Sequence, residues 1–252
     1  MTFDVAAESY DRFMGRYSSL LAPLFADFAD LRAGRGVLDV GCGPGALTGE
    51  LVRRVGADHV AAVDPSAPFV EAARARFAGV DVRQAAAEQL PFPDAGFDAA
   101  LAQLVVHFLR DAVAGIAEMA RVVLPGGIVA ACVWDFGGHA DPLSTFWASA
   151  HELDPDVVDE SGLAGAREGH LVELFEAAGL ADVQPAELVV SLEHATFDEW
   201  WAPYTGGVGP AGAYLQRQDA ARREQLRERC RTRLGEGPFT ITARAWAARG
   251  IA

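Results

Sequence analysis

The stretch VLDVGCGPG, residues 37–45, decides the fold. Its first four residues are a short apolar run typical of a buried strand, and a helical pattern begins directly behind it near Ala46. Gly41, Gly43 and Gly45 allow the main chain to turn tightly and let a ligand approach backbone N–H groups without a Cβ in the way. The helix that follows directs its positive N-terminal end to the same place. This order of strand, glycine-rich turn and helix predicts a binding loop for an organic ligand.

Outward from this stretch, short apolar runs alternate with segments that have the length and apolar spacing of helices. Strand, helix and strand repeated with short links are typical of a parallel sheet with helices on both faces, so an α/β fold is expected. Two more strands are expected near the C-terminal end. The runs expected as strands are 37–40, 59–64, 80–84, 97–102, 127–134, 182–193 and 238–248.

The segments around this core predict a single domain over 1–252 that carries lids. Residues 4–31 are expected as two helices broken near Gly15, and a lone Arg-rich helix is expected over 214–234, after an irregular stretch from 197 to 212. No internal repeat or low-complexity linker separates a second domain. The expected parts are an N-terminal helical lid over 1–34, a cofactor-binding core over 35–134, and lid insertions over 135–167 and 194–236.

Composition excludes several classes of function. The 252 residues carry 21 basic and 35 acidic side chains, a formal charge of −14. Such a field repels nucleic acid and anionic membranes, so neither is expected as a partner. All the basic residues are Arg, which rules out a lysine Schiff base and a P-loop with its Lys.

Three scattered cysteines, Cys42, Cys132 and Cys230, predict neither a disulfide framework nor a zinc site. The acidic start of the chain is unlike a signal peptide, which predicts a cytoplasmic protein.

Two carboxylates accompany the glycine-rich stretch. Asp64 closes the next strand, where it is placed to accept hydrogen bonds from a ribose diol. The glycine-rich turn and the acidic strand end also suit a dinucleotide, because Gly41, Gly43 and Ala46 satisfy the looser GxGxx(G/A) spacing. Asp39, two residues before the first glycine, favours a ligand with an ammonium group and would repel a pyrophosphate. An NAD(P)-dependent oxidoreductase therefore stays as an alternative.

Four motifs in order now carry a resemblance: VLDVGCGPG, the acidic strand end at Asp64, AEQLPFPDAGFD at 87–98 and RVVLPGG at 121–127. Together they resemble the class I S-adenosylmethionine-dependent methyltransferases, of the small-molecule type similar to quinone-biosynthesis methyltransferases. The resemblance implies a Rossmann-like sheet of seven strands, mostly parallel, with an antiparallel last strand. It implies S-adenosylmethionine as cofactor and a small organic molecule as methyl acceptor.

The resemblance also implies residue roles. Gly41, Gly43 and Gly45 would pass beneath the methionine portion and the ribose, and Asp39 would meet the ammonium group. Asp64 would hold the ribose hydroxyls, with Pro65 against the adenine and Ala87 and Glu88 along its edge. Gln103 would lie near the methionine portion. Tyr10, Arg16 and Tyr17 would close over the site as a lid, with Arg16 a partner for the methionine carboxylate.

Two departures from the family pattern concern adenine and a turn. Ala85 and Ala86 stand where an Asp often receives the adenine amino group, so that contact is left to the backbone or to Glu88. Leu124 stands where Lys often precedes the ProGlyGly turn.

No catalytic residue is predicted. His107 is weighed as a packing residue or a substrate neighbour, and Asp135, His139 and Asp141 as a polar lid entrance or a source of a base. Aromatic residues of the later lids suit an apolar acceptor pocket or plain lid packing. A protein that binds S-adenosylmethionine without methylating is a further alternative. The sequence makes no prediction of oligomeric state. The aromatic residues meant are Trp147, Trp200, Trp201 and Tyr204.

Overall fold

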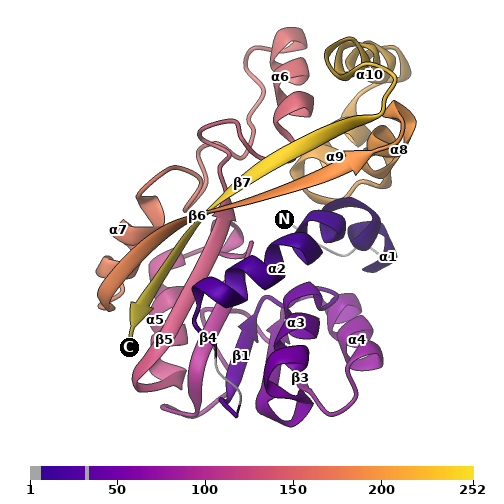
Figure 1. Ribbon diagram of the computed structural model, residues 1–252. Coiled ribbons are helices and arrows are strands. Elements are labelled where there is room, and N and C mark those ends of the chain that lie inside the picture. The colour runs from indigo at the N-terminus through magenta and orange to yellow at the C-terminus, as the bar shows by residue number, and fades with distance from the viewer. Residues whose placement is uncertain (1–6, 32–33) are drawn as a thin grey trace.

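A computed structural model describes residues 7–31 and 34–252 (Figure 1). Its seven strands form one sheet in the order β3-β2-β1-β4-β5-β7-β6. β1 lies between β2 and β4, with Val37 opposite Val60 on one side and Ala99 on the other. The strands are β1 (Val37–Val40), β2 (Val60–Asp64), β3 (Asp81–Gln84), β4 (Phe97–Gln103), β5 (Val123–Trp134), β6 (Ala181–His194) and β7 (Phe239–Ile251).

The burial of the strands agrees with their directions in the sheet. Every residue of β1 and β2 is buried, as expected for parallel strands covered on both faces. β1 to β5 run parallel to one another, whereas β7 runs antiparallel between β5 and β6. The predicted Rossmann-like sheet of seven mostly parallel strands is therefore confirmed.

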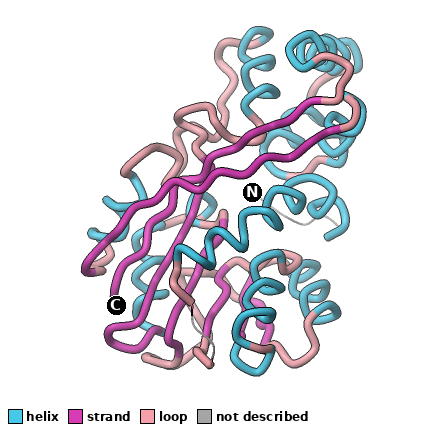
Figure 2. The backbone as a smooth tube through the Cα atoms, in the orientation of Figure 1, coloured by secondary structure: helices cyan, strands magenta, loops and turns pink. Residues whose placement is uncertain are grey.

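Helices pack around this sheet and gather beyond one of its edges (Figure 2). An N-terminal helical run crosses the carboxyl ends of the parallel strands and contacts both α3 and β6. The α-helices are α1 (Ala7–Tyr10), α2 (Arg16–Phe28), α3 (Ala46–Val55), α4 (Ala67–Arg76), α5 (Ala112–Val122), α6 (Ser144–Leu153), α7 (His170–Ala177), α8 (Phe197–Trp201), α9 (Gly209–Arg217) and α10 (Ala220–Leu234). Shorter helical turns are η1 (Asp11–Gly15), η2 (Ala57–His59), η3 (Val106–Phe108) and η4 (Ala202–Gly206).

β6 and β7 continue as a two-stranded ribbon past the sheet that they share with β5. β5 pairs with β7 only from Ala245 to Ile251, while residues 239–244 pair with β6 alone. Figure 1 shows this ribbon reaching the group formed by α6, α8, α9 and α10, which we call the upper lobe. One continuous cluster of buried apolar residues runs from the strands into the upper lobe.

The predicted break near Gly15 is wrong. Gly15 has helical backbone angles, and the π-helical turn η1 joins α1 to α2 without interruption. A π-turn inserts an extra residue while the helix continues, so a glycine there need not end it. Residues 4–6 of the predicted segment lie outside the described residues.

Two predictions about the later segments are also wrong. The stretch 197–212 contains α8, η4 and the first turn of α9, with Gly207 and Val208 between the last two. Thr196 accepts a hydrogen bond from the Glu199 N–H and caps α8. The Arg-rich segment forms two helices, because Gln218 is extended and Asp219 caps a new helix by accepting from the Arg222 N–H at 2.8 Å.

Candidate cofactor site

The crevice for a ligand lies where the strand order reverses. β1 and β4 are neighbours, but the chain leads from β1 toward β2 and from β4 toward β5. Loops that leave these two strand ends diverge, and open α/β sheets bind ligands in the gap that results. The loop after β1 holds the glycine-rich stretch, and Gln103 ends β4. The sequence-predicted residues thus meet at one edge of the sheet.

The glycine-rich loop is fixed on the end of β2. The N–H groups of Gly41 and Cys42 both donate to the Val63 carbonyl, at 2.8 and 2.9 Å. A Cβ on Gly41 would lie 2.4 Å from Val105 Cγ2, in the segment after β4, so the two strand ends approach too closely for any side chain. The loop therefore keeps one shape, set by its contact with both neighbouring strands.

Gly43 faces open space. Its φ is +54°, and a Cβ built on it would meet no atom within 4 Å. Its N–H donates to Asp64 Oδ2 at 2.9 Å. A side chain here would enter the space beside the Asp64 carboxylate. This arrangement fits a ligand that lies flat against bare main chain.

Asp64 is the acceptor at this place. It ends β2, is buried, and accepts one N–H on each oxygen, from Gly43 and from Ser66 at 2.8 Å. Burial raises its pKa, and these two backbone hydrogen bonds oppose that rise. Each carboxylate oxygen has a second lone pair, so the side chain is able to accept two ribose hydroxyls as well.

Asp39 lies deeper in the same crevice. It is 1% exposed, and Oδ2 accepts the Thr48 hydroxyl at 2.6 Å. Burial raises the pKa of Asp39 to about 7; the Thr48 hydrogen bond lowers it and the Asp64 charge raises it further. A buried carboxylate of this kind gains most from a cation, which suits the predicted contact with an ammonium group.

Gln103 supplies an unsatisfied acceptor. Its Nε2 donates to the Ser18 carbonyl at 3.0 Å, which fixes the amide plane. Its Oε1 is buried and has no hydrogen-bond partner within 7–31 and 34–252. Buried polar atoms without partners are rare and mark places where a ligand or water completes the site. The side chain therefore fits an ammonium donor.

The N-terminal residues divide between two neighbours. Tyr10 packs its ring edge on Phe69 with centroids 5.4 Å apart, and burial raises its pKa to about 12, with added effects of the Asp64 and Asp11 charges. Tyr10 thus lies over the cofactor crevice. Tyr17 instead shares a 2.9 Å hydrogen bond with His194, and Arg16 forms an ion pair with Glu199 at 2.8 Å. The predicted cofactor contacts of Arg16 and Tyr17 stay predictions.

Three residues are predicted to contact the adenine, and their side chains differ in exposure and in hydrogen-bond partners. Pro65 is exposed and its carbonyl accepts from Gln84 Nε2 at 3.0 Å. Ala87 is buried, and Glu88 Oε1 accepts the Arg110 N–H at 2.9 Å. Glu88 therefore has its other oxygen for a ligand. The roles predicted for these three residues stay predictions.

The polar side chains that follow β4 and β5 differ in whether other residues already bind them. Asp135 pairs with Arg244 at 2.6 Å, and Asp141 is held by the Leu143 N–H and the Ser144 hydroxyl. His107 is buried with no partner for Nδ1 among the described residues, and burial lowers its pKa to about 3. His139 is exposed. Of these side chains, His107 alone combines burial at the crevice side with an unpaired atom.

His194 is the residue that sequence reasoning missed. It ends β6, is buried, and has no partner for Nδ1 in the described chain. Its partner Tyr17 is 177 positions away, so no local pattern signals the pair. The only signal in the sequence is its place at the end of a predicted strand.

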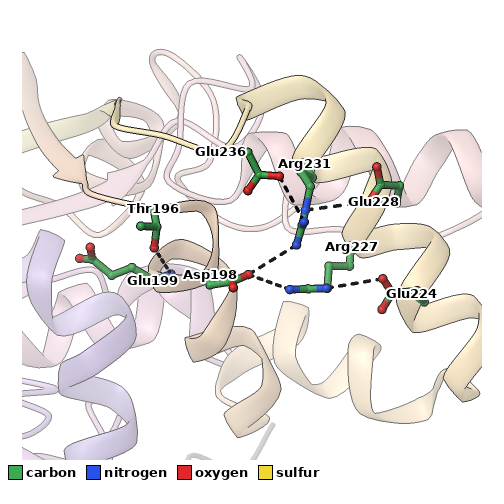
Figure 3. A network of polar contacts seen from close by, with 8 residues as sticks. All are labelled: Thr196, Asp198, Glu199, Glu224, Arg227, Glu228, Arg231 and Glu236. Carbon is green, nitrogen blue, oxygen red and sulfur yellow. Dashed lines mark hydrogen bonds and ion pairs between the residues drawn. The ribbon is translucent and has the colours of Figure 1, made fainter.

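The Arg-rich segment is used for internal ion pairs. Arg227 and Arg231 of α10 both reach Asp198 of α8, at 2.7 and 3.5 Å, and Arg231 also pairs with Glu236 at 3.2 Å (Figure 3). These contacts fasten α8 to α10.

The described residues hold no cluster of side chains suited to a metal ion. No helix within residues 7–31 and 34–252 is long and apolar enough to cross a bilayer.

Comparison with known proteins decides the class of the site. Residues 38–131 match the family model described as a methyltransferase domain. The chain contains a class I methyltransferase domain. The crevice built from Gly43, Asp64 and Gln103 fits S-adenosylmethionine, the cofactor that the sequence predicts.

Curated relatives support the methyltransferase domain. Malonyl-[acyl-carrier protein] O-methyltransferase of Erwinia billingiae is 36% identical over 127 residues, which cover 50% of this chain and 49% of that protein. 2-Methyl-6-phytyl-1,4-hydroquinone methyltransferase 2 of Oryza sativa subsp. japonica is 34% identical over 150 residues, covering 59% and 39%. The second name agrees in part with the predicted resemblance to quinone-biosynthesis methyltransferases. The chain spans about half the length of the curated relatives that it matches.

A solved structure shows the same fold. The YcgJ protein of Bacillus subtilis superposes with a TM-score of 0.59 at 23% identity, covering 94% of this chain and 98% of that one. The likeness in fold therefore covers more of the chain than residues 38–131.

Proposed function

We propose that this protein transfers the methyl group of S-adenosylmethionine to a small organic acceptor. The observation that carries the proposal is the crevice at the ends of β1, β2 and β4. There, the open space at Gly43, the Asp64 carboxylate and the unpartnered Gln103 Oε1 lie at one sheet edge. These are the groups needed for bare main chain under the ligand, a sugar acceptor and an ammonium acceptor.

The protein's own contribution is binding and alignment. When bound, the cofactor supplies an electrophilic methyl group on a sulfonium and leaves as a neutral thioether. The β1–α3 loop would hold the donor, Asp64 the ribose and Asp39 with Gln103 the ammonium group. Tyr10 would cover the crevice and exclude water. Proximity and orientation of this kind lower barriers by roughly 7 to 11 kcal/mol in well-oriented systems.

An acceptor that loses a proton also needs a base. His107 is buried and its Nδ1 has no partner among the described residues, which suits a neighbour of the acceptor, but burial lowers its pKa to about 3 and makes it a weak base. Asp135 is already paired with Arg244. A base is required only where the acceptor atom carries a proton during attack.

Mass spectrometry tests the proposal. The protein is incubated with S-adenosylmethionine and pools of small acids, phenols, thiols and amines, and each pool is searched for a gain of one methyl group. We expect at least one methylated product, formed much more slowly by Asp64→Ala. Repeated failure over broad pools, with S-adenosylhomocysteine still bound, would favour the alternative of a protein that binds the cofactor without methylating.

The remaining predictions belong with this proposal. A dinucleotide cofactor is disfavoured by Asp39 and by the match to the methyltransferase domain. The absence of nucleic-acid partners is proposed on the −14 charge. The division into a lid over 1–34, a core over 35–134 and lid insertions over 135–167 and 194–236 is proposed as well.

A further inference from the structure

A second enclosed space lies on the other side of the N-terminal helix from the cofactor crevice. Arg12, Phe13 and Arg16 line it from η1 and α2, and Trp200 with Tyr204 line it from α8 and η4. The cavity is about 10 Å³, which holds a single water molecule. A larger ligand therefore enters only when the helix or the aromatic rings move apart.

This space and the cofactor residues share one wall, the helix α2. Tyr17 lines it and packs edge-on against Trp134, the last residue of β5, with centroids 6.4 Å apart. The next residue of the same helix, Ser18, accepts the Gln103 amide on its carbonyl. The helix is thus a shared wall, with the cofactor residues on one side and this space on the other.

The charge of the lining is positive. Arg12 and Arg16 both line the space, and none of the described residues around it is acidic. Arg16 is balanced by Glu199 at 2.8 Å. Arg12 is exposed and makes no hydrogen bond or ion pair with the described residues, since its neighbour Asp11 pairs with Arg76. One guanidinium therefore remains free for an anion in a chain that is otherwise strongly acidic.

Much of the remaining lining is aromatic. Tyr204 stacks on Phe146 with centroids 4.7 Å apart and meets Phe13 edge-on at 4.8 Å. The ion pairs of Figure 3 fasten α8, which carries Trp200, to α10. Rings of this kind suit a flat or apolar body.

We propose that this space is the acceptor site and that the acceptor is an apolar or aromatic anion, with its anionic group on Arg12 and its body against Phe13, Trp200 and Tyr204. Tyr17 and His194, which share a 2.9 Å hydrogen bond, also line the space. The inference rests on the proposed function, since it assigns the acceptor of that same reaction.

Titration calorimetry tests this site without requiring turnover. The protein is first saturated with S-adenosylhomocysteine and then titrated with indole-3-acetate or with indole-3-acetamide, which has the same ring and no charge. We expect the acid to bind about tenfold more tightly than the amide, a difference of ~1.4 kcal/mol. Arg12→Gln should remove that preference. Arg217→Gln, an exposed arginine of α9 away from the space, should keep it.

The outcomes separate the two proposals. Equal binding of acid and amide, no saturable binding of either, or an acid preference that survives Arg12→Gln would overturn the anionic acceptor site. The first titration, with S-adenosylhomocysteine alone, reports on the cofactor site independently. An acid preference that depends on Arg12, in a protein that methylates no tested compound, would support this site and count against the proposed function.

Discussion

Two glycines of the β1–α3 loop are required for different reasons. Gly41 has no room for a Cβ, because Val105 lies against it, whereas Gly43 has room that faces the proposed ligand. Substitution at Gly41 would disturb the fold, so it says little about binding. Substitution at Gly43 separates binding from folding.

Gly43→Ala should weaken binding of S-adenosylhomocysteine by about tenfold or more, because the new methyl group enters the space beside Asp64. The backbone cost of Ala at positive φ, ~1–2 kcal/mol, should be matched by Gly126→Ala, whose φ is +83° and whose surroundings are also open. Calorimetry and urea unfolding of both variants measure the two effects. Equal affinities for the two variants would remove Gly43 from the site.

Asp39 predicts a pH dependence of stability. Its folded-state pKa of about 7 is above the value of about 3.9 in an unfolded chain, so the folded protein keeps a proton that the unfolded chain releases. The associated stability is present at low pH and is lost as the pH rises to about 7.

Asp39→Asn should therefore change the free energy of unfolding little near pH 4 and raise it by ~1–4 kcal/mol above pH 7, relative to the unchanged protein. Urea unfolding across this pH range measures the gap. The exposed Asp58→Asn serves as the control for the loss of one aspartate charge. A constant gap for Asp39→Asn would contradict the burial argument.

At the scale of elements, the pair of Tyr17 and His194 fastens α2 to the end of β6. Tyr17→Phe would leave both nitrogens of the buried His194 without a partner, because Nδ1 has none among the described residues. We expect a loss of ~1–3 kcal/mol in the free energy of unfolding.

Tyr214→Phe is the matched control, since it removes the same oxygen atom from a buried ring of α9 without breaking a hydrogen bond between described side chains. Denaturant unfolding of both variants measures the two losses in the free energy of unfolding. Equal stability of the two variants would show that the Tyr17 hydroxyl does not hold the helix.

Local sequence signals explain which elements were predictable. The parallel strands are short apolar runs between helices, so their order and approximate limits follow from the pattern. Two helix starts also carry local signals. Asp219 caps α10 and marks the break near 218, and Thr196 followed by Glu199 marks the start of α8. The π-turn η1 has no comparable signal.

For the whole molecule, one apolar core joins the parallel sheet to the upper lobe through the β6–β7 ribbon. We therefore expect a single cooperative unfolding transition. Tryptophan fluorescence reports mainly on the upper lobe, the end of β5 and the middle of β7, whereas far-ultraviolet circular dichroism reports on the whole chain. Separate midpoints for these two probes would show that the upper lobe is an independent unit.

Long-range contacts set the limit of prediction from sequence. The glycine-rich loop, Asp64 and Gln103 follow strand ends, so topology alone brings them together. The acceptor space instead combines residues near positions 12, 142, 194 and 204, whose proximity depends on the path of the β6–β7 ribbon. The pairing of Arg16 with Glu199 depends on the same path.

The structure of the protein bound to S-adenosylhomocysteine tests the cofactor site most directly. We predict that the ribose hydroxyls lie on the Asp64 carboxylate, that the main chain at Gly43 faces the ligand, and that the ammonium group meets Gln103 Oε1. A ligand found elsewhere on the molecule, or one whose sugar leaves Asp64 in contact with only the Gly43 and Ser66 amides, would contradict the site.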